Sequence, residues 1–260
     1  MSLDSSQLER FADDLYEAYS TGSPIPPLTD ETEFSVEEAY DIQSRFVDRI
    51  GDGDPAIAAH KLGLVSEAKQ EQLGIQEPIF GYVTEETVLD EPVIPTDEII
   101  SPRIEAEIGL LLDEDIAAPA STTDVLRATA AVVPVIEILE SRFQGWTIPS
   151  AQDVIADNTS AGRIFVGESL TDVTDVDMPT ESVLVSVNGE VETTGTGADI
   201  MGHPARAVSW LANRLEQRDD RLRAGELVMT GGITAAIDIE PGDVYNVTFG
   251  SIGSIDLRAE

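Results

Sequence analysis

The sequence predicts an α+β fold in which a helical N-terminal part packs on a strand-rich, mixed-β body. Amphipathic helical patterns dominate the first fifty residues, and short apolar runs of strand length dominate from about residue 80. Expected strands outnumber expected helices, and the two kinds are segregated along the chain, as in α+β proteins. We therefore expect a helical region over 1–80 and a mixed-β catalytic body over 81–260.

Two helices are expected near the N-terminus. Leu8, Phe11 and Leu15 recur at spacings of three and then four, which places them on one helical face. Ser35 followed by Glu38 has the pattern of a capping box and predicts the start of a second helix. The apolar face of that second helix consists of Ala39, Ile42, Phe46 and Ile50.

The body shows strand and turn signals. Residues 183–191 predict a hairpin, with Asn188-Gly189 at its turn. Pro204 suits the first turn of a helix. Further strands are expected over 226–229 and 243–249.

The chain is extremely acidic. It has 50 Asp and Glu against 15 Lys and Arg, a formal net charge of −35 and a pI near 4.1. Such a chain repels itself at low ionic strength, so the composition predicts a halophilic protein of a salt-accumulating, haloarchaeal cytoplasm. The same charge argues against nucleic acid or an anionic membrane as a partner.

Other features narrow the class of protein. The chain has no cysteine, which excludes disulfides, thiolate metal sites and a cysteine nucleophile. The N-terminus lacks a basic segment followed by an apolar stretch, and no apolar run reaches the length of a membrane span. We therefore expect a soluble, cytoplasmic protein.

Three glutamates stand in apolar strand patterns. Residues 103–112 read RIEAEIGLLL, so Glu105 and Glu107 share one face of the expected strand. Glu137 lies within an aliphatic run over 132–139 that predicts a buried strand. Buried carboxylates are costly unless paired or bound to a cation, and all-oxygen ligation favours Mg²⁺ or Mn²⁺. In so acidic a chain Glu-x-Glu also arises by chance, so a surface position is the alternative for this pair.

Lysine is nearly absent, which draws attention to Lys61. Only Lys61 and Lys69 occur, and Lys61 lies among small and apolar residues. It is either a surface side chain or a partly buried ammonium that binds a substrate carboxylate or moves a proton. Lys69 lies in a polar stretch that predicts an exposed helix start, and we assign it no role.

Other catalytic motifs are absent. His60 and His203 are the only histidines, and no Gly-x-Ser-x-Gly motif supplies a serine nucleophile for them. The glycines of residues 230–234 (TGGIT) lack the lysine that follows in a phosphate-binding loop.

Several segments, in the same order along nearly the whole chain, resemble one family. The chain is similar to the 2-oxopent-4-enoate (2-keto-4-pentenoate) hydratase and 4-oxalocrotonate decarboxylase family of the fumarylacetoacetate-hydrolase-like superfamily. The matching segments are 61–64 (KLGL), 72–75 (QLGI), 78–81 (PIFG), 102–108 (PRIEAEI), 136–142 (IEILESR), 155–158 (IADN) and 242–243 (GD).

The resemblance implies the mixed-β fold of that superfamily, a divalent metal (Mg²⁺ or Mn²⁺), a small 2-oxo acid substrate and a homo-oligomer. By position, it implies that Glu105, Glu107 and Glu137 bind the metal. It also makes Lys61 the active-site lysine and places Ser160 near the substrate.

The resemblance leaves the reaction open between two branches of aromatic meta-cleavage catabolism. Ile79 stands where hydratases commonly carry an acidic residue, and residues 229–235 look more like the decarboxylases. Residues 145–148 favour the hydratases. We expect a hydratase of the 2-oxopent-4-enoate type, with a 4-oxalocrotonate-type decarboxylase as the alternative. A C–C hydrolase of acylpyruvates and a non-enzymatic metal-binding protein are more distant alternatives.

Overall fold

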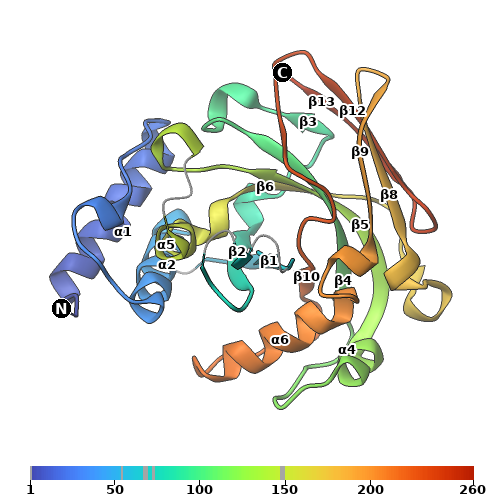
Figure 1. The fold of residues 1–260 in the computed structure, drawn as a ribbon, viewed down its shortest axis with the longest axis horizontal. Coiled ribbons are helices and arrows are strands. Elements are labelled where there is room, and N and C mark those ends of the chain that lie inside the picture. The colour runs from blue at the N-terminus through green and yellow to red at the C-terminus, as the bar shows by residue number, and fades with distance from the viewer. Residues whose placement is uncertain (1, 54, 67–69, 72–73, 147–149) are drawn as a thin grey trace.

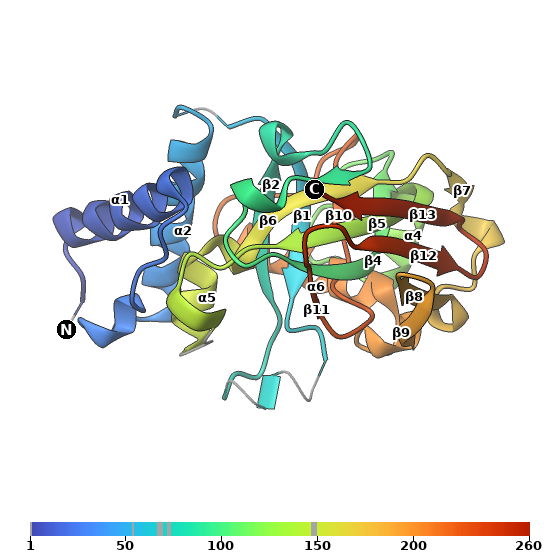
Figure 2. The same cartoon turned by 90° about the horizontal axis from the view of Figure 1, so that it is seen from above.

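Three helices gather at one end of the molecule, and the other described helices with bounds below lie beside the strand-rich body (Figure 1 and Figure 2). The computed structural model describes residues 2–53, 55–66, 70–71, 74–146 and 150–260, so Lys69 and residues 147–148 lie outside the described part. Figure 1 shows α1, α2 and α5 side by side, apart from the strand-rich body. The helices are α1 Ser5–Thr21, α2 Val36–Ile50, α4 Thr122–Ala128, α5 Ala151–Ala156 and α6 Pro204–Glu216.

The described residues of the body form two sheets. The larger has the order β2-β1-β10-β4-β5-β6, with β11 paired to β4 and β7 paired to β5. Its strands are β1 Ile57–Gly63, β2 Ile79–Thr84, β4 Arg103–Leu112, β5 Thr129–Leu139, β6 Ala161–Val166, β7 Thr171–Asp172, β10 Leu227–Met229 and β11 Ile237–Asp238. It is a mixed sheet, because β1 pairs with β10 in parallel whereas β4 pairs with β5 and β10 in antiparallel fashion.

The smaller sheet has the order β3-β13-β12-β8-β9. Its strands are β3 Val93–Ile94, β8 Ser182–Val187, β9 Glu190–Thr196, β12 Val244–Phe249 and β13 Ser254–Ala259. Figure 2 shows β12 and β13 far from α1 and α2. Within this sheet β8 and β9 form the predicted hairpin, and Asn188 (φ 54°) and Gly189 (φ 86°) adopt the left-handed conformations of its turn.

The N-terminal helices form as the sequence predicts. Leu8, Phe11 and Leu15 of α1 are buried. Ser35 caps α2, because its side chain accepts a hydrogen bond from the Glu38 N–H. The Glu38 carboxylate in turn accepts from the Ser35 N–H at 2.7 Å, which completes the capping box. The strand β1 lies inside the segment 1–80 and belongs to the larger sheet. The division at residue 80 stays a prediction.

A buried amide joins the helical part to the body. The Gln43 side chain, on α2, donates to the carbonyl oxygens of Phe80 at 2.9 Å and Ile155 at 2.8 Å. Tyr40, one turn before Gln43, stacks on Phe80 with ring centroids 4.5 Å apart. These contacts fix α2 against β2 and α5, and both elements adjoin the cavity described below.

Among the described residues, no helix combines the length and the apolar character that crossing a bilayer requires.

The acidic surface generates the first prediction. Arg49 is shared by two acids, Glu9 and Asp13, and 15 cationic side chains cannot pair with 50 carboxylates. Unpaired like charges repel one another, and molar salt shortens the screening length to about 3 Å. We expect the melting temperature to rise steeply between dilute buffer and 1 M KCl, measured by circular dichroism. Sucrose of matched osmolality controls for preferential exclusion, and a flat profile in KCl would contradict the halophilic interpretation.

Candidate metal centre and active site

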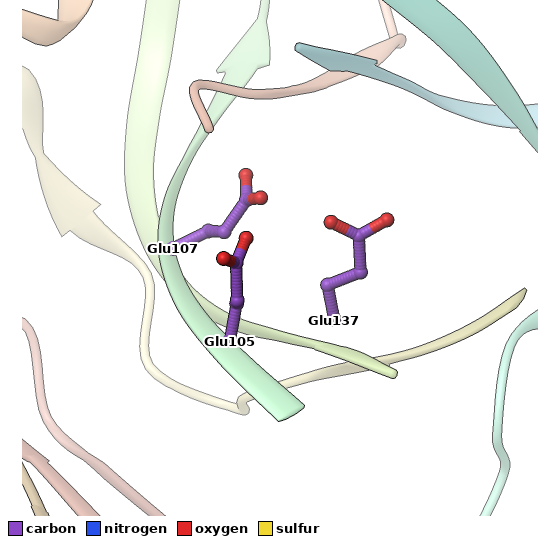
Figure 3. Close-up of side chains that lie close together, drawn as sticks. All are labelled: Glu105, Glu107 and Glu137. Atoms are coloured by element: carbon purple, nitrogen blue, oxygen red, sulfur yellow. The ribbon is translucent and has the colours of Figure 1, made fainter. Parts of the chain in front are cut away.

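Three glutamates from neighbouring strands converge at the centre of the larger sheet. In the antiparallel register of β4 and β5, Glu105 lies directly opposite Glu137. Glu107 follows two residues after Glu105 and therefore points to the same face. One carboxylate oxygen from each residue lies within 4.8 Å of the other two, and Figure 3 shows the convergence of the three side chains.

Burial makes this cluster electrostatically unfavourable on its own. Glu107 and Glu137 are 0% and 1% exposed. Desolvation raises the pKa of Glu107 well above its usual value, and the Glu137 charge acts in the same direction. Desolvation also raises the pKa of Glu137, although Lys61 opposes that shift. Within the described part of the chain, Glu107 Oε1 and Glu137 Oε2 accept no hydrogen bond. The cluster therefore requires protons or a cation.

The donor set fits a hard divalent cation. The cluster offers only carboxylate oxygens, which are the ligands that Mg²⁺, Ca²⁺ and Mn²⁺ prefer. The loop after β10 is shaped around these oxygens. The Gly231 N–H donates to Glu107 Oε2 at 2.8 Å. A Cβ atom at Gly232 would lie 2.1 Å from Glu105 Oε2, so any side chain there would displace that carboxylate from its present position.

Lys61 adjoins the carboxylates from β1. It is 2% exposed, and its Nζ lies 2.9 Å from Glu137 Oε1. The same Nζ donates to the Thr159 carbonyl oxygen at 2.6 Å. The structure therefore places Lys61 in the interior, which removes the surface side-chain alternative.

The segment that receives Lys61 has an unusual backbone. Asn158, Thr159 and Ser160 all have positive φ angles, at 51°, 54° and 56°. Non-glycine residues adopt this conformation at a cost and need surrounding contacts to hold them there. The Asn158 amide group exchanges bonds of 2.9 and 2.7 Å with the backbone of Tyr82, and Thr159 Oγ1 donates to the Phe80 carbonyl at 2.7 Å.

A buried ion pair supports the residues that flank this segment. Arg142 is 1% exposed, and its Nε donates to the Asp157 carboxylate. Its Nη1 donates to the Ala161 carbonyl at 2.7 Å. Arg142 thus holds the residues on both sides of the left-handed segment. Burial raises the pKa of Asp157 to about 7 even though the Arg142 guanidinium opposes the shift.

A cavity of about 300 Å³ adjoins the cluster, and Glu105 lies in its wall, whereas Glu107 and Glu137 lie behind the residues that line it. Lys61, Glu105 and Ser160, all predicted from the sequence, lie in its wall together with Arg103. Most of the remaining lining is apolar, including Ile79, Leu139 and Val154. A cavity of this size and character suits a small acid with an apolar body rather than a polymer.

Sequence reasoning missed several residues of the site. Gly231 and Gly232 were considered only as parts of a phosphate-binding loop, although adjacent glycines after a strand also signal close approach of the backbone. Arg103 shares the face of Glu105 by strand alternation, and this signal was available. The role of the Thr159 carbonyl had no signal in the sequence. His60 pairs with Glu226 at 3.2 Å, and His203 accepts from the Ala205 N–H at the start of α6.

The chain is similar to several known proteins. Residues 56–259 match the family model described as fumarylacetoacetate (FAA) hydrolase C-terminal. A 4-oxalocrotonate decarboxylase from Pseudomonas sp. (strain CF600) is 36% identical over 237 residues, covering 90% of this chain and 89% of its own. A 2-keto-4-pentenoate hydratase from Paraburkholderia xenovorans (strain LB400) is 36% identical over 257 residues, covering 98% and 95%.

A solved structure resembles the whole chain. It is 4-oxalocrotonate decarboxylase from Pseudomonas putida G7 complexed with magnesium and adipate, with a TM-score of 0.95, 33% identity and 99% of both chains covered. The chain belongs to the fumarylacetoacetate hydrolase C-terminal family. Its relatives are hydratases and decarboxylases, so it is an enzyme of the lyase class. The family and the fold class predicted from the sequence are thus confirmed.

The carboxylate cluster generates the second prediction. Glu137→Gln should abolish turnover and weaken Mg²⁺ or Mn²⁺ binding by more than about tenfold, the lower range for disturbing even an outer-shell group. Calorimetric titration with the metal salt measures the affinity. Glu190→Gln, an exposed change on β9, is the matched control.

Glu137→Gln also removes the carboxylate that pairs with the buried Lys61 ammonium, and the loss of this ion pair destabilises the fold. Glu105→Gln is therefore tested in parallel, with circular dichroism to establish folding. Wild-type turnover by either variant after exhaustive chelation would rule out the metal centre.

Proposed function

We propose that the chain is a divalent-metal-dependent lyase of small 2-oxo and 2-hydroxydienoic acids, and that it hydrates substrates of the 2-oxopent-4-enoate type. The observation that carries the proposal is the junction of three buried carboxylates with a buried lysine beside one small cavity. The Mg²⁺ of the decarboxylase structure supports a divalent ion, and we propose Mg²⁺ or Mn²⁺ here.

The protein groups divide the chemistry between them. We propose that Glu105, Glu107 and Glu137 hold the ion, which when bound supplies Lewis acidity that polarises the 2-oxo group of the substrate. The Lys61 ammonium forms an ion pair with Glu137 and donates a hydrogen bond to the Thr159 carbonyl. Because an ammonium has three N–H donors, Lys61 can also donate to the substrate, where it orients the carboxylate or moves a proton.

The cavity wall contributes by excluding water from most of the substrate. Its apolar lining lowers the local dielectric, which strengthens the attraction between the fixed charges and the charge that develops on the substrate oxygen. Ser160, held by the left-handed segment, offers a hydroxyl to the bound acid. In the hydratase reaction, water adds to the far carbon of the conjugated alkene.

A 4-oxalocrotonate-type decarboxylase is the second candidate. One observation favours it: Ile79, apolar and 2% exposed, lines the cavity where hydratases of the family commonly carry an acidic residue. An apolar wall favours loss of charge from a carboxylate, as occurs when CO₂ departs. The two reactions use the same metal and the same lysine. The choice between hydration and decarboxylation therefore depends on the cavity wall around Ile79.

Product analysis separates the candidates and forms the third prediction. The enzyme is offered 2-hydroxypenta-2,4-dienoate and 4-oxalocrotonate separately, with Mg²⁺ or Mn²⁺ at high salt, and products are identified by NMR. We expect hydration of the dienoate. Release of CO₂ from 4-oxalocrotonate without hydration would favour the decarboxylase. An acylpyruvate is offered in a third assay, in which two carboxylic acid products would identify a C–C hydrolase. No turnover of any of the three substrates would reject the proposal.

Lys61 generates the fourth prediction. In the metal-loaded enzyme, Lys61→Met should preserve the fold and should not weaken metal binding, because the bound ion compensates the Glu137 carboxylate in place of the ammonium. It should lower kcat/KM by roughly two orders of magnitude or more, the scale of a lost acid–base group. Lys61→Arg should rescue poorly, because a planar guanidinium neither fits the same space nor readily gives up a proton. Steady-state kinetics with metal titration measure both effects. If the kcat/KM of Lys61→Met stayed within a factor of about two of wild type, the loss would be far smaller than that of an acid–base group. Such a result would remove Lys61 from the mechanism.

Two properties implied by the resemblance and the composition stay predictions, namely a homo-oligomeric assembly and a cytoplasmic location.

A further inference from the structure

We propose that Arg103 forms a second anion-binding point in the active-site cavity and binds the distal carboxylate of a 2-oxo dicarboxylic acid. The inference rests on the proposed function, because it requires the 2-oxo end of the substrate to lie at the carboxylate cluster. It concerns the second candidate of that proposal, because 2-oxopent-4-enoate carries one carboxylate and 4-oxalocrotonate carries two.

The position of Arg103 on β4 is the first support. Arg103, Glu105 and Glu107 alternate along the strand and share one face. At a rise of about 3.3 Å per residue, Arg103 lies about 7 Å along the strand from Glu105. Both residues line the cavity that also contains Lys61. A short-chain diacid with its 2-oxo end near Glu105 can therefore extend along the strand toward Arg103.

The orientation of the guanidinium is the second support. Arg103 Cζ lies 4.5 Å from the centroid of the Trp146 ring, which holds the group flat. Nε donates to Asp238 Oδ1 at 2.6 Å, whereas the two Nη groups donate no hydrogen bond to any described residue. A planar guanidinium held through one edge keeps another pair of N–H donors for a carboxylate.

The charge balance of the cavity is the third support. Among the described residues that line it, Lys61 and Arg103 are the cationic ones, and Lys61 is already bound to Glu137. A protein with a net charge of −35 repels a dianion from most of its surface. A diacid therefore needs a cation at its distal end, and Arg103 is placed to supply it.

Asp238 does not cancel this charge. Its side chain is 74% exposed and that of Arg103 is 33% exposed, so the pair is largely solvated. Exposed ion pairs are weak, because water and salt screen them. A substrate carboxylate inside the cavity is screened less and can share the guanidinium with Asp238.

A purely structural role for Arg103 makes a different prediction. In that case Arg103 would only clamp β11 and Trp146 to β4, and its removal would weaken the binding of every ligand equally. An anion-binding role instead changes the preference between a diacid and a monoacid of equal length. The ratio of the two affinities therefore separates the roles.

The fifth prediction uses 2-oxoadipate and 2-oxohexanoate, which have the same chain length and differ in the distal carboxylate. Binding to the full-length Mg²⁺-loaded enzyme is measured by calorimetry at fixed salt. We expect wild type to bind 2-oxoadipate about tenfold more tightly, the scale of a charge-assisted pair that is partly buried. Arg103→Gln should remove this preference while leaving 2-oxohexanoate affinity within about twofold, and Arg103→Lys should retain part of it.

Two variants serve as controls. Asp238→Asn removes the acid that competes for Arg103, so the preference for the diacid should persist or increase, whereas loss of a clamp would reduce the binding of both probes. Arg258→Gln makes the same change of charge on β13, at a side chain that is 60% exposed, and should leave the ratio unchanged.

Equal affinities for the two probes in wild type, or equal loss of both in Arg103→Gln, would overturn the role of Arg103 and leave the proposed function standing. Failure of both probes to bind in a Mg²⁺-dependent way would overturn the proposed function together with this inference.

Discussion

The mutual repulsion of three buried carboxylates is the constraint on which the rest of the site depends. Glu105 and Glu137 face each other across two strands, and Glu107 stands beside them. Like charges directly opposite in a sheet are destabilising, and burial increases the penalty. The chain supplies partial relief through the Gly231 N–H and Lys61. The negative charge that these two groups leave uncompensated attracts a cation to the site.

A second constraint follows from placing an ammonium group beside that cluster. Lys61 needs an acceptor besides Glu137, and the Thr159 carbonyl provides it only because residues 158–160 adopt left-handed conformations. That backbone is held on one side by the edge of β2 and on the other by Arg142. The helical part joins the same region, because Gln43 binds the carbonyls of Phe80 and Ile155. Packing outside the cavity thus supports the position of the Lys61 ammonium.

Local patterns explain how much the sequence could predict. The capping box at Ser35, the turn at Asn188-Gly189 and the alternation around Glu105 depend on neighbouring residues, so they were readable. The pairing of β4 with β5 brings Glu137 to Glu105, but the register depends on contacts across the sheet that no local pattern contains. The contact between Lys61 and Thr159 joins residues 98 apart in the chain and depends on a strained backbone. Such features are properties of the assembled fold.

The pairing of β4 with β5 has a consequence for how the chain finds its native state. A strand that slips by one residue presents its other face, so Ile104, Ala106 and Ile108 would replace the glutamates at the centre. Both strands are rich in aliphatic residues, which makes the slipped pairing a real competitor during folding. A divalent ion would bind only the native alignment and would stabilise it by mass action. The ion would then select the native alignment of β4 and β5 during folding, in addition to any part that it takes in the chemistry.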